Sequence, residues 1–229
     1  GPTLVLRNNG DGAFEPIQPF ESVVNLRDFA WADFDHDGDP DAALLDAEGV
    51  LHVFDDERAG RFRARPAPEG LGPVDALAIA DLNADGAMDL VLLNRAAIHR
   101  LSDRDDGRAW DLGEVARRPE GDATAPGEAR LIVADLDNNG GVDLIASDAG
   151  AARLWLDDAA GRHDPLDHAP ALRTNAAADL DGDGRLDLVG VADGRPARGL
   201  NRGAESYAWQ AIRPRAAKAV GDGRINSFG

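Results

Sequence analysis

The sequence contains no cysteine. This absence excludes disulfide bonds, zinc sites built from thiolates and catalysis by a thiol nucleophile. The sequence also lacks any apolar run of about 18 residues, the length that a membrane-spanning helix needs. We therefore expect no insertion into a membrane.

Positive charge is scarce. The 229 residues include 24 Lys and Arg against 42 Asp and Glu, so the formal net charge is −18. A chain this acidic repels phosphate, which argues against a nucleic acid partner and against an anionic membrane surface. Hydrophobic residues make up 43% and charged residues 29% of the chain, a balance typical of a globular protein rather than a disordered one.

Helical periodicity is also missing. Apolar residues at helical spacing do not persist for three turns, and 26 glycines and 13 prolines interrupt most windows of the sequence. The chain is therefore predicted to be all-β, with almost no helix.

A nine-residue acidic segment occurs four times and aligns without gaps. The copies begin at Asp33, Asp81, Asp135 and Asp179, which lie 48, 54 and 44 positions apart. This spacing matches one four-stranded blade of a β-propeller. Each copy follows an alanine and precedes a short apolar run, the pattern of a strand that is buried on both faces.

A second hairpin pattern completes each repeat, and at the N-terminus it stands alone from Leu4 to Phe14. We therefore predict a β-propeller of four-stranded antiparallel blades, with four complete blades and the outer half of a fifth. The expected units are the half blade at 1–20, blades at 21–70, 71–120, 128–170 and 171–213 with loops 33–41, 81–89, 135–143 and 179–187, and a last segment at 214–229.

Each repeated segment reads D-x-[DN]-x-[DN]-G-x-x-D. Oxygen-bearing side chains stand at positions 1, 3, 5 and 9, glycine at position 6 permits a sharp turn, and position 7 can offer its backbone carbonyl. Hard oxygen ligands in this number favour Ca²⁺ over Zn²⁺ or copper, and the looser geometry favours it over Mg²⁺. The sequence predicts up to four calcium ions, and the expected ligands are Asp33, Asp35, Asp37, Asp39 and Asp41; Asp81, Asn83, Asp85, Ala87 and Asp89; Asp135, Asp137, Asn139, Gly141 and Asp143; and Asp179, Asp181, Asp183, Arg185 and Asp187, with Asp39, Ala87, Gly141 and Arg185 acting through the backbone carbonyl.

Two other interpretations of these segments are an EF-hand and a solvated acidic turn. An EF-hand needs Glu at position 12 and flanking helices, and neither is present. A solvated acidic turn is the ordinary interpretation of one such segment, but four copies in one register favour a metal site. We expect the first loop, with its additional Asp39 and Pro40, to bind calcium most tightly, and the third, with Asn139 and two successive glycines, most weakly.

At these loops the chain resembles the FG-GAP/VCBS repeats, the calcium-loop propeller repeats also found in integrin α-subunits. The resemblance runs from Leu4 to about Ile212, and the hairpin from Asn8 to Phe14 is similar to the VCBS variant. The tail at 221–229 resembles the start of an ASPIC/UnbV domain. The resemblance implies a fragment of a roughly seven-bladed propeller, from a large bacterial secreted protein that extends beyond both ends of this sequence.

No combination of nucleophile and base stands out, and the five histidines are scattered. The sequence therefore favours a non-catalytic structural or recognition module. We expect it to belong to a secreted or cell-surface protein, because extracellular calcium modules bind calcium with Kd values of roughly 10⁻⁴ to 10⁻³ M, which suits a compartment with millimolar calcium. The expected ligand is an unknown protein or glycan, and open blade edges could support self-association. The alternatives are the propeller scaffold of a polysaccharide lyase or hydrolase, and a carbohydrate-binding module that uses exposed tryptophans. We expect Trp31, Trp110, Trp155 and Trp209 to pack between blades instead.

Overall fold

The computed structural model describes residues 1–58, 60–119, 128–148 and 151–203. In these ranges the chain forms strands and no helix, so the prediction of an all-β chain is confirmed. The strands are β1 (Val5–Asn8), β2 (Phe14–Ile17), β3 (Leu26–Ala32), β4 (Asp41–Asp46), β5 (Leu51–Asp56), β6 (Phe62–Arg65), β7 (Ala76–Ala80), β8 (Asp89–Leu93), β9 (Ala97–Arg104), β10 (Ala109–Arg117), β11 (Arg130–Ala134), β12 (Asp143–Ser147), β13 (Ala152–Asp157), β14 (His163–Pro165), β15 (Arg173–Ala178), β16 (Asp187–Ala192) and β17 (Arg195–Gly199).

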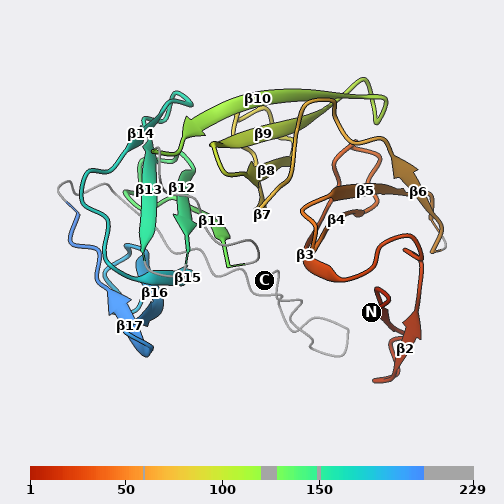
Figure 1. The fold of residues 1–229 in the computed structure, drawn as a ribbon, viewed down its shortest axis with the longest axis horizontal. Coiled ribbons are helices and arrows are strands. Elements are labelled where there is room, and N and C mark those ends of the chain that lie inside the picture. Colours follow the sequence, from red (N-terminus) through yellow and green to blue (C-terminus); the bar gives the residue numbers. More distant parts are fainter. Residues whose placement is uncertain (59, 120–127, 149–150, 204–229) are drawn as a thin grey trace, which may run out of the picture.

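The strands form separate antiparallel sheets in which neighbours in sequence pair with each other. Strands β3 to β6, β7 to β10 and β11 to β14 make three four-stranded sheets, and β15 to β17 make a three-stranded sheet. Strands β1 and β2 form a hairpin at the start of the chain. The sheets follow one another along an arc, with the β1–β2 hairpin at one end and β17 at the other (Figure 1). This arrangement is consistent with propeller blades.

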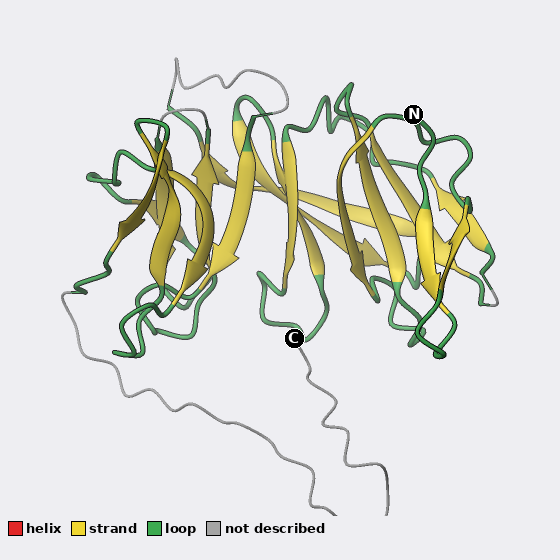
Figure 2. Cartoon of the chain, turned by 90° about the horizontal axis from the view of Figure 1, so that it is seen from below, coloured by secondary structure: helices red, strands yellow, loops and turns green. Residues whose placement is uncertain are grey.

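The first strand of each of the larger sheets lies on the inner side of the arc. Strands β3, β7, β11 and β15 are neighbours in this order (Figure 1). The acidic loops follow the ends of these inner strands, so the loops share one face of the molecule and the starts of the inner strands share the other. Seen from the side, the strands run between the two faces, and turns lie at both (Figure 2).

The second strand of each four-stranded sheet is buried on both faces, as the apolar runs predicted. All five residues of β8 are buried, and their side chains alternate between two cores. Leu90 and Leu92 pack towards the preceding sheet, whereas Val91 and Leu93 pack towards the following one. Hydrophobic packing therefore joins adjacent sheets, and it fixes where the loops lie.

The last sheet has three strands in the described part of the chain. The fourth strand predicted before residue 213, the tail at 214–229 and most of the connection before 128 lie outside the described residues. A pocket of about 790 Å³ lies between this sheet and the preceding one, and its apolar lining includes Leu154, Leu156 and Leu188. Within the described ranges, no helix could span a membrane.

Candidate functional site: the four acidic loops

The backbone of the four loops follows one path. Gly38, Gly86, Gly140 and Gly184 at position 6 have φ values of 90°, 89°, 90° and 85°. The predicted need for glycine at this position is therefore confirmed. Position 4 is also left-handed, with φ values of 63°, 55°, 60° and 80° at His36, Ala84, Asn138 and Gly182. The sequence did not reveal this second turn, because three residues other than glycine occupy it and accept some strain.

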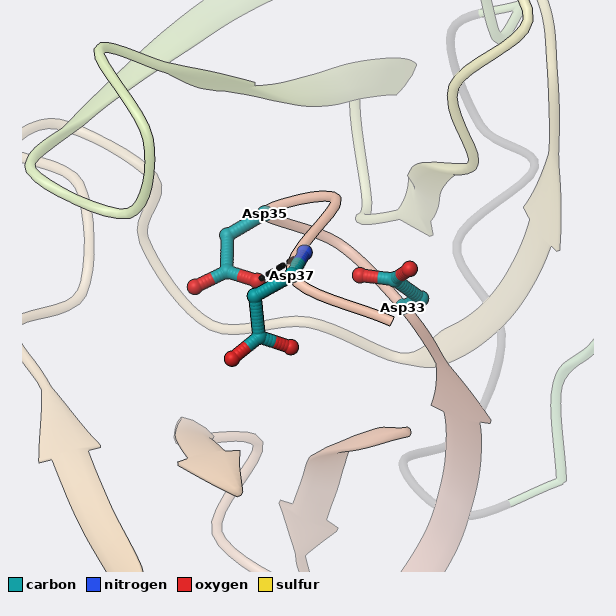
Figure 3. A group of neighbouring side chains, drawn as sticks. All are labelled: Asp33, Asp35 and Asp37. Atoms are coloured by element: carbon teal, nitrogen blue, oxygen red, sulfur yellow. Dashed lines mark hydrogen bonds between the residues drawn. The ribbon is translucent and has the colours of Figure 1, made fainter. Parts of the chain in front are cut away.

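Hydrogen bonds inside the loops fold the acidic side chains over the backbone. The carboxylate at position 1 accepts the N–H of the position-6 glycine in all four loops, at 3.1 Å in the first loop and 2.9 Å in the second. In the first loop, Asp37 also donates its backbone N–H to Asp35 Oδ1 at 3.2 Å (Figure 3). These bonds keep the side chains at positions 1, 3 and 5 close together.

The Asp at position 9 anchors each loop in the sheet. Asp41, Asp89, Asp143 and Asp187 are all at most 1% exposed. One carboxylate oxygen accepts the backbone N–H of position 2, for example Leu136 N to Asp143 Oδ2 at 2.7 Å. In the first three sheets the other oxygen accepts a donor from the third strand, for example Asp157 N to Asp143 Oδ1 at 2.8 Å, and in the fourth sheet it accepts the N–H of Asn201, just after β17. This residue therefore joins the loop to two strands.

Burial also raises the pKa of these anchoring carboxyls. Desolvation raises the pKa of Asp41 to about 6 and that of Asp143 to about 6, although two backbone N–H donors act in the opposite direction in each case. The pKa of Asp89 is raised for the same reason. Nearby loop carboxylates add to the increase, because like charges disfavour ionisation. A bound cation would remove this penalty.

The structure brings the predicted carboxylates together in three of the loops. In the first loop, Asp33, Asp35 and Asp37 each place an oxygen within 4.8 Å of the others. In the third and fourth loops the acids at positions 1, 3 and 9 form such a group. They are Asp135, Asp137 and Asp143 in the third loop, and Asp179, Asp181 and Asp187 in the fourth. The second loop, which has Asn83 at position 3, contributes no such group of three acids within the described ranges. There Asn83 Nδ2 donates to Asp85 Oδ2 at 2.7 Å.

The oxygen atoms of these loops suit a hard divalent cation as ligands. They are carboxylate and carboxamide oxygens, the ligands that Ca²⁺ prefers. In the first loop, Asp33 Oδ1 is buried and accepts no hydrogen bond from the residues that the structure describes. Carboxylates at this spacing repel each other, and a cation between them would replace this repulsion with electrostatic attraction. At position 7, the side chains of Asp39 and Arg185 form ion pairs with Arg58 and Asp183, which leaves the backbone as the predicted ligand there.

One acidic residue near the first loop does not belong to the repeated segment. Asp55 in β5 is 3% exposed and lies within 4.8 Å of Asp35 and Asp41, measured between carboxylate oxygens. Burial raises the pKa of Asp55, although Arg65 and Arg63 favour its charged form. In each sheet, the residue after the anchoring Asp pairs with a residue of the third strand, and in the first sheet Asp55 comes directly after that partner. The residues at the same position in the other sheets are Ser102, Leu156 and Leu200. Only a register-based comparison of the repeats could have singled out Asp55.

The tryptophans and most histidines have structural partners. Trp31 packs against Phe20 and Phe62, and Trp155 is 3% exposed. Trp110 donates its indole N–H to Pro66 O at 2.9 Å and lies 3.5 Å below the Arg65 guanidinium. These three side chains therefore contribute to packing, whereas Trp209 lies outside the described residues. Of the histidines, His52 bonds Asp46, His99 bonds Asn94 and His163 bonds the Val142 carbonyl, while His36 and His168 are exposed.

Comparisons with known proteins agree with this architecture. The structure is similar to that of an Agrocybe aegerita lectin, described as recognising non-reducing terminal N-acetylglucosamine, with a TM-score of 0.63 and 22% identity over 88% of this chain and 58% of that chain. It also matches the Tc holotoxin pore of Photorhabdus luminescens with a TM-score of 0.48 and 21% identity, over 81% of this chain and 9% of that chain. The chain thus spans less than two thirds of the length of either protein.

A search of curated proteins found no match. The sequence model of the FG-GAP-like repeat matches residues 33–92, a segment that holds the first two acidic loops and the strands between them. Residues 33–92 of this propeller-like, all-β chain are therefore similar to an FG-GAP-like repeat.

Proposed function

We propose that this chain is a calcium-stabilised, non-catalytic recognition module of a secreted or cell-surface protein. The observation that carries the proposal is the repetition of one loop geometry, with glycine at position 6 and a buried Asp at position 9 in all four loops and clustered carboxylates in three of them. Calcium would be held by the ligands that the sequence predicts in each loop, up to four ions in all. When bound, calcium supplies positive charge that offsets the crowded carboxylates.

Calcium would stabilise the blades in place of disulfides. Each loop joins the first and second strands of its sheet, and in three of the sheets its position-9 Asp also contacts the third strand. A cation that binds only the folded loop adds about 2.7 kcal/mol per site when its concentration is 100 times the Kd. The FG-GAP-like match at 33–92 supports this role.

Thermal unfolding in EDTA, in a calcium series and in a magnesium series would test the proposal. We expect a large calcium-specific rise in melting temperature, and isothermal titration should count the sites. Changing the position-1 carboxylate of a loop, for example Asp135→Asn, should remove one site, whereas the matched exposed change Asp167→Asn should remove none. No response to either cation would show that the loops are only acidic turns, and an equal response to calcium and magnesium would show cation binding without selectivity for calcium.

A glycan is the ligand class that the comparison with the lectin favours. That lectin shares the fold at 22% identity, and its ligand is a terminal sugar. A neutral and acidic glycan array, followed by product analysis of each positive glycan, would test this choice. Calcium-dependent binding without turnover supports a recognition module. Product formation would instead indicate the polysaccharide-active enzyme, and binding of protein ligands alone would exclude the glycan.

The finer features of the resemblance complete the proposal. We place the described sheets in a ring of about seven blades within a larger bacterial protein, with VCBS-type outer hairpins and an ASPIC/UnbV segment that begins in the tail. Without the other blades, the edge strands at the two ends of the arc would favour self-association. Light scattering of this chain beside a longer version of the parent protein would test this: the longer protein should be monomeric.

A further inference from the structure

The third and fourth acidic loops are joined by hydrogen bonds that cross from one sheet to the next. Asn138, at position 4 of the third loop, donates its side-chain amide to the Gly184 carbonyl in the fourth loop at 3.0 Å. Asn201, just after β17, donates its amide to the Leu136 carbonyl in the third loop at 2.7 Å and to the Leu186 carbonyl in the fourth at 3.2 Å. The Asn201 side chain therefore bonds both loops at once.

These bonds continue into the two anchoring carboxylates. The Leu136 N–H donates to Asp143 Oδ2 at 2.7 Å, and the Asn201 N–H donates to Asp187 Oδ1 at 2.8 Å. Asp143 and Asp187 are the predicted calcium ligands at position 9, and each is at most 1% exposed. A path of hydrogen bonds thus connects the position-9 ligand of one loop, through Leu136 and Asn201, to that of the other.

Within the described ranges, the first and second loops have no such connection. Their hydrogen bonds in this part of the chain all stay within each loop's own sheet. The residues at the register position of Asn201 in the first three sheets are Asp56, Asp103 and Asp157. An ionised carboxylate accepts hydrogen bonds and has no hydrogen to donate, so these side chains cannot bond a carbonyl of a neighbouring loop. The amide of Asn201 is therefore what allows the fourth sheet to bond the loop before it.

The bonds between the third and fourth loops require the folded path of both loops. Without a cation, the clustered carboxylates of each loop repel one another and disfavour the path that brings them together. When the third loop leaves this path, the Leu136 carbonyl and the Asn138 amide lose their partners. When the fourth loop leaves it, Gly184 and Asp187 lose theirs. Cation binding holds one loop in its folded path, so that loop offers the partners that the other needs and lowers the cost of ordering it.

We propose that the third and fourth loops bind calcium with positive cooperativity, and that Asn138 and Asn201 transmit the coupling. This inference rests on the proposed calcium binding and adds the regulation of two of its sites. The affinity of either loop should rise about fivefold when the other is occupied, and the factor is the same in both directions because coupling is reciprocal. The first and second loops, which lack the bonds, should bind calcium independently of each other.

Calcium titration against a chromophoric chelator measures the coupling in a background that lacks the first two sites, Asp33→Asn with Asp81→Asn. The coupling factor is the product of the two affinities in this background, divided by the product of the single affinities that remain after Asp179→Asn and after Asp135→Asn. We expect a factor of about five.

The two asparagines are then changed together in the same background. Asn138→Gly with Asn201→Ala should reduce the factor to about one while both ions still bind. Asn175→Ala, at an exposed asparagine of β15, is the matched control and should leave the factor unchanged. Thermal unfolding of each variant shows whether it still folds.

The same measurement on the first and second loops, in a background that lacks the third and fourth sites, should give a factor of about one. Both sets of variants remove the same number of charges, so a difference between the two factors does not arise from net charge.

The outcomes separate the coupling from calcium binding itself. Two ions that bind with a factor of one overturn the cooperativity and leave calcium binding in place. A factor that persists in the folded Asn138→Gly and Asn201→Ala variant, or that is equally large in the first two loops, overturns the role of the two asparagines. Absence of calcium binding at every loop overturns the proposed function and the coupling with it. A factor above one that only the two asparagine changes abolish supports the inference.

Discussion

The third and fourth acidic loops have nearly the same sequence pattern but different surroundings. Leu136 at position 2 of the third loop is 5% exposed, whereas Leu180 at the same position of the fourth is 42% exposed. Asp135 and Asp137 are partly buried, but Asp179 and Asp181 are exposed. The difference follows from the neighbouring sheet, because the third loop has one packed beside it and no described sheet follows the fourth.

The fourth sheet also bonds directly to the third loop. Asn138 Nδ2 donates to Gly184 O at 3.0 Å, and Asn201 Nδ2 donates to Leu136 O at 2.7 Å. These bonds connect the two loops and hold the third against its neighbour. A repeated motif can thus have a similar backbone in each copy and still sit in a different environment.

Truncation at position 2 should separate the two loops most strongly. Leu136→Ala removes a buried side chain between two sheets and should lower the free energy of unfolding by about 2–5 kcal/mol. Leu180→Ala should change it by no more than about 0.5 kcal/mol, since this side chain is exposed. Urea unfolding with saturating calcium measures both. Equal losses would show that the exposed surface of Leu180 is covered in solution.

The anchoring Asp of the third loop should give the next largest effect. Asp143→Asn can satisfy only one of the two backbone N–H donors that the carboxylate accepts, at 2.7 and 2.8 Å. Leaving a buried donor without a partner should cost about 1–3 kcal/mol. Unfolding in EDTA measures this cost without any metal contribution. Asp179→Asn, at an exposed position of the fourth loop, is the control and should have a smaller effect in EDTA.

The pH dependence of the calcium-free protein should reveal the same buried carboxyl. The pKa of Asp143 rises from 3.8 to about 6 on folding, so the folded state binds the proton more tightly than the unfolded state does. Its contribution to stability is therefore present at low pH and is lost as the pH rises through this window. Between the two pKa values, the urea midpoint measured in EDTA should fall with rising pH, and it should fall less steeply in the Asp143→Asn variant than in the unmodified protein. An unchanged slope would contradict the prediction.

The contact between the two loops should give the smallest effect. Asn138→Gly keeps the left-handed backbone at φ 60° and removes the bond to Gly184 O. We expect a loss of about 0.5–1.5 kcal/mol. Gly182→Asn, the reverse change in the fourth loop, should be close to neutral because Asn tolerates this conformation. Urea unfolding measures both changes, and a loss for Asn138→Gly no larger than that for Gly182→Asn would contradict the prediction.

Much of the fold could be read from periodicity. The apolar runs after the loops predicted doubly buried second strands, and β4, β8 and β12 follow this prediction. The turn at position 6 followed from glycine. The left-handed position 4 was missed, since His36 and Ala84 carry no local signal for a positive φ. The calcium ligands remain a prediction, although their side chains lie together in three loops.

Other features depended on register or on distant residues. Asp55 approaches the first loop because β5 pairs with β4, and nothing in the motif marks it. Arg27, Asp75 and Arg173 line one small polar pocket, although they are far apart in the chain and lie in no shared motif. A sequence pattern reports neighbours along the chain, whereas these sites arise between sheets.

The sequence by itself determined the local chemistry of this protein: alternating strands, glycine turns and a nine-residue loop rich in carboxylates. These depend on residues that are close in the chain, so composition and spacing carry them. Only the tertiary structure decided which loop is covered, which acid joins the first cluster and which arginines and acids come together between the sheets. Burial, pKa and polar pairing depend on the neighbouring sheet, and packing between sheets determines which residues become neighbours.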